Sequence, residues 1–240
     1  MKLLIALLLC CSLRATDLLI AAASDLAPIA PKLEKAYKER IRFTLASSGS
    51  LKQQIENGAP FDVFLSASEK YVLDLGDLVT DRTVYATGRI ALWSPNGSVT
   101  SLADLRKSSV VHLAIPNPQH APYGVAAKEA LESQHVWKDV EPKIVYGENV
   151  RQALQFAESG NVDAVITSWT LLIGKGTLLP AEWHSPIRQT GAVVKASGQT
   201  DAARRFLKFL TGAGAQKILK DGGFMGKLML HPTELADAGN

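Results

Sequence analysis

Two serine-containing turns carry the residues of this chain that are best suited to binding chemistry. Ser24 follows the apolar run 18–23, and Ser47 and Ser48 follow the β-prone run 42–46, and a helical pattern of apolar residues comes after each turn. The first N–H groups of a helix have no backbone acceptor, and hydroxyl groups there add donors beside the positive end of the helix dipole. An oxyanion could accept hydrogen bonds from both turns at once. The two turns therefore predict an anion site.

Two further helix starts could face the same site. One is Ala121-Pro122-Tyr123-Gly124, after a proline-containing loop, and the other is Glu148-Asn149-Val150-Arg151. In open α/β sheets, ligands bind beyond the carboxyl ends of the strands, where helix N-termini converge. Apart from Arg151, no Lys or Arg lies within one residue of these starts, so N–H and O–H dipoles would hold the anion. Selectivity would then depend on cavity size and on the number of donors.

The elements that must position these groups alternate along the chain, which is typical of an α/β fold with mostly parallel sheets. We predict strands at 18–22, 42–46, 62–66, 89–94, 111–115, 143–146, 162–167 and 187–195. Helices are predicted at 28–40, 51–57, 101–107, 123–133, 149–159, 200–211 and 213–220. A late return of the chain to the first sheet would give two lobes, with crossovers near 83–87 and 189–193. Two lobes imply a cleft between them.

The N-terminal segment has the pattern of a secretory signal peptide. Met1-Lys2 is a basic start, residues 3–9 are continuously apolar, and Ala15 offers a small residue for cleavage. We therefore expect a signal peptide over 1–15 and an exported protein; lipid attachment at Cys10 or Cys11 is the less favoured alternative. Both cysteines of the chain lie in this segment, so the exported part would contain no disulfide.

Charge and histidine spacing exclude several other functions. Removal of the signal segment would leave 24 basic against 23 acidic residues, which gives no support for a nucleic-acid partner. The five histidines show no metal-ligand spacing, so we expect no directly coordinated metal cation. No Gly-x-Ser-x-Gly motif is present, and Leu51 stands three residues after Ser48, where some serine enzymes have Lys. The sequence therefore favours a binding protein without a cofactor over an enzyme.

Several motifs together resemble the periplasmic molybdate-binding proteins of ABC-type importers. They are Ala21-Ala22-Ala23-Ser24, the turn 46–51 (ASSGSL), the segment 54–67 (QIENGAPFDVFLSA), His120-Ala121-Pro122-Tyr123-Gly124 and Asn149-Val150-Arg151. The resemblance covers most of the chain. It implies a two-lobed periplasmic-binding-protein-like (type II) fold, in which each lobe is a mostly parallel sheet flanked by helices. We place lobe I at 16–84 and 192–240 and lobe II at 85–191, with the ligand cleft between them.

The resemblance also implies which residues contact the ligand. Ser24 and Ser48 would give hydroxyl and backbone N–H donors from lobe I, and Tyr123 and Val150 would give backbone N–H donors from lobe II. In the better-known branch of the family a Tyr adds a hydroxyl, and here Thr167 takes its place. Either Thr167 or Ser168 replaces that donor, or the donor is missing.

Asp25 places a carboxylate next to the predicted site. We expect it to cap the following helix, with its side chain turned away from the ligand and only its N–H offered.

The implied function is capture of molybdate, and of tungstate as well, for delivery to a membrane permease by a protein expected to be monomeric. Three alternatives stay open: another oxyanion such as sulfate or phosphate, an organic acid, and a Ser-dependent enzyme or transferase on the same two-lobed fold. Protonated phosphate would benefit from an acceptor in the cage, and Asp25 is the nearby carboxylate that could serve. The orientation of Asp25 therefore distinguishes phosphate from a fully deprotonated anion.

Overall fold

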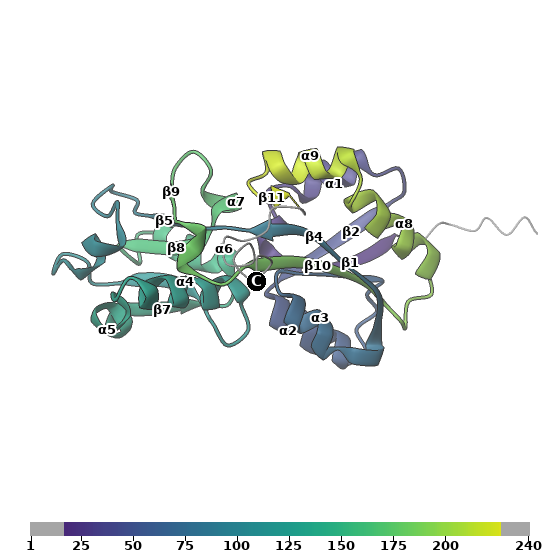
Figure 1. The fold of residues 1–240 in the computed structure, drawn as a ribbon, viewed down its shortest axis with the longest axis horizontal. Helices are drawn as coiled ribbons and strands as arrows, with labels where there is room; N and C mark the ends of the chain where they lie inside the picture. The colour runs from purple at the N-terminus through teal and green to yellow at the C-terminus, as the bar shows by residue number, and fades with distance from the viewer. Residues whose placement is uncertain (1–16, 227–240) are drawn as a thin grey trace, which may run out of the picture.

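The computed structural model describes residues 17–226, which form two lobes side by side, each built around its own sheet (Figure 1). The predicted signal peptide at 1–15 lies outside the described residues. The chain builds most of the first lobe, crosses to the second, and returns to complete the first.

The first lobe contains a six-stranded sheet with the order β11-β4-β10-β3-β1-β2. Its strands are β1 (Leu18–Ala23), β2 (Ile41–Ala46), β3 (Val63–Ser66), β4 (Val79–Gly88), β10 (Ile187–Val194) and β11 (Met225–Gly226). Its helices are α1 (Ala30–Ala36), α2 (Ser48–Glu56), α3 (Glu69–Asp74), α8 (Thr200–Leu210) and α9 (Ala213–Asp221). Helices α1, α8 and α9 cover one face of the sheet, and α2 and α3 cover the other (Figure 1).

The second lobe contains a five-stranded sheet with the order β7-β6-β8-β5-β9. Its strands are β5 (Ile90–Trp93), β6 (Leu113–Pro116), β7 (Ile144–Gly147), β8 (Ala164–Ser168) and β9 (Thr177–Leu178). Its helices are α4 (Pro122–Ser133), α5 (Trp137–Val140), α6 (Val150–Glu158) and α7 (Trp169–Leu172). Short 3-10 turns connect several elements, at 24–26, 76–78, 102–106, 141–143 and 181–183; the predicted helix at 101–107 is one of them.

Both sheets are mixed, which corrects the expectation of mostly parallel sheets. β1 pairs in parallel with β2 and β3, and β6 with β7 and β8, as predicted for strands joined by helices. By contrast, β10 is antiparallel to β3 and β4, and β5 is antiparallel to β8 and β9. The reason is the route of the chain, because a strand that enters or leaves a lobe runs against the strands already there.

The crossing points lie a few residues from the predicted ones. β4 stays in the first sheet as far as Gly88, and β5 begins in the second sheet at Ile90. On the return, β10 joins the first sheet at Ile187. The predicted boundary at 84/85 therefore falls inside β4, and the boundary at 191/192 falls inside β10. No strand was predicted at 79–88, and within the predicted strand 187–195 no local pattern marks the point at which the chain joins the first sheet.

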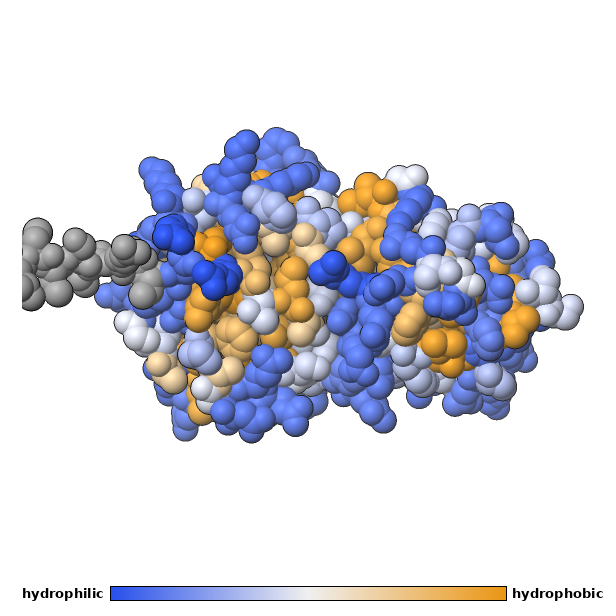
Figure 2. All heavy atoms as spheres, turned by 180° about the vertical axis from the view of Figure 1, so that it is seen from behind, coloured by the Kyte–Doolittle hydropathy of each residue, from blue (hydrophilic) through white to orange (hydrophobic). Residues whose placement is uncertain are grey.

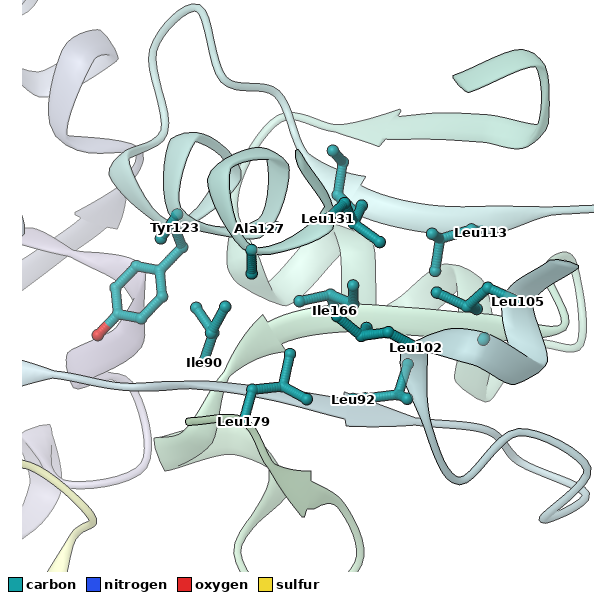
Figure 3. Close-up of a cluster of buried hydrophobic side chains, with 14 of the residues drawn as sticks. Ile90, Leu92, Leu102, Leu105, Leu113, Tyr123, Ala127, Leu131, Ile166 and Leu179 are labelled. Carbon is teal, nitrogen blue, oxygen red and sulfur yellow. The ribbon is translucent and has the colours of Figure 1, made fainter. Parts of the chain in front are cut away.

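Each lobe has its own apolar core. In the second lobe, Leu92, Leu113, Leu131 and Ile166 are buried between α4 and the sheet, and Tyr123 lies at one end of this cluster (Figure 3). In the first lobe, Phe206 and its neighbours on α8 pack on the opposite face from α2 and α3. The apolar cluster of the second lobe also includes Ala23 and Ala67 of the first lobe, so it extends to the junction of the lobes.

The face of the molecule behind that of Figure 1 carries both hydrophilic and apolar areas. Hydrophilic residues cover most of the rim of both lobes, and smaller apolar areas lie between them (Figure 2). Within residues 17–226 no helix is both long enough and apolar enough to cross a membrane.

Candidate functional site

A small cavity lies between the lobes, at the carboxyl ends of β1, β2 and β3 in the first lobe and of β6 and β7 in the second. Five segments line it, three from the first lobe and two from the second. The lining residues are Ala23, Ser24, Asp25, Ala46, Ser47, Ser48, Ala67, Ala121, Pro122, Tyr123, Asn149 and Val150. Both serine turns and both further helix starts of the sequence analysis therefore meet at one place.

Ser24 supplies a hydroxyl group that has no protein partner. It comes directly after β1, its side chain is buried, and none of the described residues hydrogen-bonds to its Oγ. A buried hydroxyl without a partner costs free energy, typically about 1 to 3 kcal/mol. This cost is removed if a ligand in the cavity accepts the hydroxyl proton.

Ser48 is oriented differently and has one proton left to donate. Its Oγ accepts a hydrogen bond from the Ala67 N–H at 2.9 Å, at the end of β3. Because the oxygen is an acceptor in this bond, the hydroxyl proton stays available to an anion. The capping of α2 falls to the residue before it, since Ser47 Oγ accepts from the Ser50 N–H. The two adjacent serines thus divide the roles of cap and donor.

Tyr123 and Val150 bring backbone N–H groups from the second lobe. Tyr123 is the second residue of α4, and Val150 is the first residue of α6. The cap of α6 is Asn149, whose Oδ1 accepts from the N–H groups of Arg151 and Gln152, so the cap leaves the Val150 N–H unused. N–H groups in the first turn of a helix carry partial positive charge, and both residues line the cavity. They can therefore donate to an anion without a cationic side chain.

Like Ser168, and unlike the other predicted site residues, Thr167 does not line the cavity. It is the fourth residue of β8 and fully buried, and its hydroxyl donates to the Val150 carbonyl oxygen at 2.9 Å. The predicted alternative Ser168 is also engaged, because its Oγ caps α7 by accepting from the Thr170 N–H. The Thr167 side chain is shorter than that of Tyr and bonds within its own lobe, where it supports the first turn of α6.

Asp25 does not cap a helix, which differs from the expectation. Its Oδ2 accepts hydrogen bonds from the Tyr123 hydroxyl at 2.7 Å and from Gln189 Nε2 at 2.8 Å. The side chain is buried, and its Oδ1 has no partner among the described residues. Burial raises the pKa of Asp25 to about 6, although the hydrogen bonds from Tyr123 and Gln189 act in the opposite direction.

The lobes also touch through backbone at the edge of the cavity. The Gly49 N–H, in the first turn of α2, donates to the His120 carbonyl oxygen at 2.9 Å. A Cβ atom on Gly49 would lie 2.7 Å from His120 Cβ and 2.8 Å from its carbonyl oxygen. Only glycine fits this approach. The structure is therefore that of the lobes in contact.

Sequence reasoning missed the support behind the donors. Ala67 holds Ser48 and Gln189 holds Asp25, yet both come from distant parts of the chain. No local signal marks either residue, since one is an ordinary alanine after a strand and the other lies within a strand. Arg151 is exposed and lines a groove next to Ser24 rather than the cavity itself. Among the described residues no cluster of His, Cys, Asp and Glu could hold a metal ion.

A family comparison agrees with this geometry. Residues 18–225 match the model of the family described as bacterial extracellular solute-binding protein. The chain belongs to this family. The solute-binding protein is 31% identical over 225 residues to the molybdate-binding protein ModA of Rhodobacter capsulatus, which covers 88% of this chain and 89% of the relative. It is 32% identical over 234 residues to ModA of Azotobacter vinelandii, covering 90% and 93% of the two chains.

The fold of the solute-binding protein is similar to that of a solved relative. The Azotobacter vinelandii periplasmic molybdate-binding protein superposes with a TM-score of 0.81 at 28% identity, covering 87% of this chain and 99% of the other. The two-lobed fold and the family resemblance predicted from the motifs are thereby confirmed. Since these relatives are solute-binding proteins, the prediction of a binding protein rather than an enzyme is confirmed as well.

Proposed function

We propose that this solute-binding protein captures molybdate between its lobes and delivers it to an ABC-type membrane importer. The observation that carries the proposal is the buried, unpartnered hydroxyl of Ser24 in a cavity where first-turn N–H groups from two helices of the other lobe converge. A tetrahedral dianion without protons has acceptors for all of these donors. The names of the relatives support molybdate in particular.

The binding residues under this proposal are Ser24, Ser48, Tyr123 and Val150. Ser24 and Ser48 donate hydroxyl protons from the first lobe, and Tyr123 and Val150 donate backbone N–H groups from the second. Because the donors are divided between the lobes, the anion binds the closed conformation more tightly than the open one. The anion thus shifts the population toward closure, and the closed form is what a permease would recognise.

Thr167 acts behind the site in this proposal. It fixes the first turn of α6 through the Val150 carbonyl oxygen, and Ser168 does the same for α7 through its cap. Four segments of neutral donors then surround the anion, without a fifth side chain. Tungstate, which has the same shape and charge as molybdate, is expected to bind to the same donors.

The periplasm and a cleaved signal peptide complete the proposal. The extracellular family supports an exported location. The pattern of residues 1–15 supports export through a signal peptide, and a monomer is sufficient because one chain contains all the donors.

Thermal denaturation of the protein with a panel of anions tests the function. Molybdate and tungstate should each stabilise strongly when present far above their Kd, by about 2.7 kcal/mol at one hundred times Kd. Sulfate, phosphate and citrate should stabilise less. A larger shift with phosphate or citrate than with molybdate would contradict the proposal.

A further inference from the structure

The carboxyl group of Asp25 occupies an unusual position at the junction of the lobes. It is fully buried, and its two hydrogen-bond donors come from different parts of the chain. Tyr123 belongs to α4 of the second lobe, whereas Gln189 belongs to β10 of the first. The Asp25 carbonyl oxygen also accepts from the Thr170 hydroxyl of α7 at 2.7 Å. One residue is thus bonded to two helices of the opposite lobe.

These bonds depend on the lobes being in contact. Separation of the lobes would move α4 and α7 away from β1 and admit water to the Asp25 carboxyl group. The fit around Tyr123 is close, because a Cβ atom on Gly88 would lie 2.2 Å from the Tyr123 hydroxyl oxygen. In this structure the Tyr123 hydroxyl thus lies against the crossover strand at Gly88, and its bond to Asp25 holds the first turn of α4, with its N–H groups, against the cavity.

The surroundings of the carboxyl group provide no positive charge to balance an ionised form. Tyr123 and Tyr85 face it from α4 and β4, and burial raises the pKa of both phenols well above 10, so both are neutral. Gln189 and Thr170 face it from β10 and α7 and do not titrate. Within the described part of the chain Asp25 has no ion pair, and Arg151 at the start of α6 is exposed.

The anion adds a further cost to ionisation. Asp25 lines the same cavity as Ser24 and Ser48, so a bound dianion would lie next to this residue and raise the cost of a charge on it. Like charges at short range in a water-excluded site repel strongly. The backbone N–H groups of Asp25 and Leu26 favour the ionised form, but burial outweighs them. Oδ1 has no hydrogen-bond partner among the described residues and can carry a proton while Oδ2 keeps both of its hydrogen bonds.

We propose that Asp25 is a positioning residue that becomes protonated when the lobes close over the anion at mildly acidic pH, so that capture there takes up a fraction of a proton from solvent. The inference deepens the proposed function and rests on it. The proton binds to Asp25 Oδ1, and no covalent bond of the anion is broken. The neutral carboxyl group then holds Tyr123 across the lobes without repelling the ligand.

The direction of the pH dependence follows from the two states. Burial in this structure raises the pKa of Asp25 to about 6, and we take the carboxyl group of the open protein, in contact with water, to have its ordinary pKa of 3.8. Closure therefore takes up a proton between these values, and its free energy is most favourable at low pH and becomes less favourable as pH rises through about 6. With these two values, affinity should increase by about fourfold from pH 7.5 to pH 5.5, with uptake of about 0.7 proton at pH 5.5. A neighbouring dianion makes both effects larger.

Isothermal titration of the full protein with molybdate tests the inference. Titrations at pH 7.5, 6.5 and 5.5, each in two buffers of different ionisation enthalpy, give both the affinity and the number of protons taken up. Wild type should bind more tightly at pH 5.5 and take up protons. Asp25→Asn, which is neutral and of the same shape, should bind with an affinity independent of pH and without proton uptake.

A matched control addresses the other titratable pair at the cavity rim. His120 Nε2 lies 3.2 Å from Glu148 Oε2, and histidine is the side chain that commonly changes charge in this pH range. His120→Gln should keep the proton uptake of wild type. Loss of the uptake in His120→Gln, or its persistence in Asp25→Asn, would overturn the inference.

The outcomes separate this inference from the proposed function. Tight molybdate binding by wild type without proton uptake at pH 5.5 would overturn the inference and leave the function standing, even if Asp25→Asn failed to fold. Absence of molybdate binding at every pH would instead overturn the function, and the inference with it.

Discussion

Removal of the Ser24 hydroxyl should weaken anion binding without weakening the fold. The Ser24 Oγ is buried and has no partner among the described residues, so Ser24→Ala breaks no hydrogen bond of the ligand-free protein. In the complex it removes one hydrogen bond to a charged acceptor, which is typically worth about 1.5 to 3 kcal/mol. The Kd for molybdate should therefore increase by roughly 10- to 150-fold.

The free energy of unfolding of the ligand-free Ser24→Ala protein should be equal to that of wild type or higher, because a buried hydroxyl without a partner is lost. Isothermal titration gives the Kd, and urea denaturation without ligand gives the free energy of unfolding. Ser48→Ala provides the contrast. This substitution also leaves the Ala67 N–H without its acceptor, so it should reduce both the affinity for molybdate and the free energy of unfolding.

Ser94→Ala is the matched control, since Ser94 is equally buried but its Oγ donates to Asn96 Oδ1 in the second lobe, away from the cavity. It should lose about 1 kcal/mol of stability and keep wild-type affinity. The reasoning is refuted if Ser24→Ala binds molybdate within twofold of wild type, or if its ligand-free form is destabilised as much as that of Ser48→Ala.

Three further perturbations test how the lobes hold the anion. Gly49→Ala should prevent full closure of the lobes, because its Cβ would lie 2.7 Å from His120 Cβ, and should lower the affinity for molybdate at least about tenfold. X-ray scattering at saturating molybdate should show a more open molecule. Gly214→Ala is the control, since Gly214 has open space around it, and it should behave as wild type. Thr167→Val should cost about 1 kcal/mol of stability and little affinity, since its hydroxyl supports a carbonyl group of α6; a tenfold loss of affinity by titration would instead make the hydroxyl a direct donor to the anion. Arg151→Gln should slow molybdate association severalfold at low salt and not at high salt, because the exposed charge of Arg151, in the groove next to Ser24, attracts the anion at long range. Stopped-flow tryptophan fluorescence measures the association rate. An equal effect at both salt concentrations would argue for direct contact between Arg151 and the anion.

The sequence predicted the convergence of donors better than it predicted their partners. Strand ends and helix starts are local patterns, so the two serine turns and the two helix starts could be identified from them, and the family resemblance then singled out Tyr123 and Val150; all of these line one cavity. The role of Thr167 depended on the length of a side chain relative to a helix in the same lobe, which only coordinates provide.

The same limit explains the difference at Asp25. A carboxylate after a strand is a common helix cap, and the local pattern favoured that role. Its actual partners, Tyr123 and Gln189, are 98 and 164 residues away along the chain. Lobe boundaries were displaced for a related reason, because no strand was predicted where β4 lies and nothing in the composition of β4 or β10 marks where the chain passes from one sheet to the other.

The register of β4 and β10 has a practical consequence for how such proteins can change. Gly88 pairs with Ile187, so the chain leaves for the second lobe and returns from it at neighbouring points of one antiparallel ladder. The residues between them form a continuous insert with adjacent ends, the arrangement in which grafted segments are best tolerated. Exchange of this insert as a cassette between relatives would replace half of the donors in a single step while leaving the other half, and the ladder that joins them, untouched.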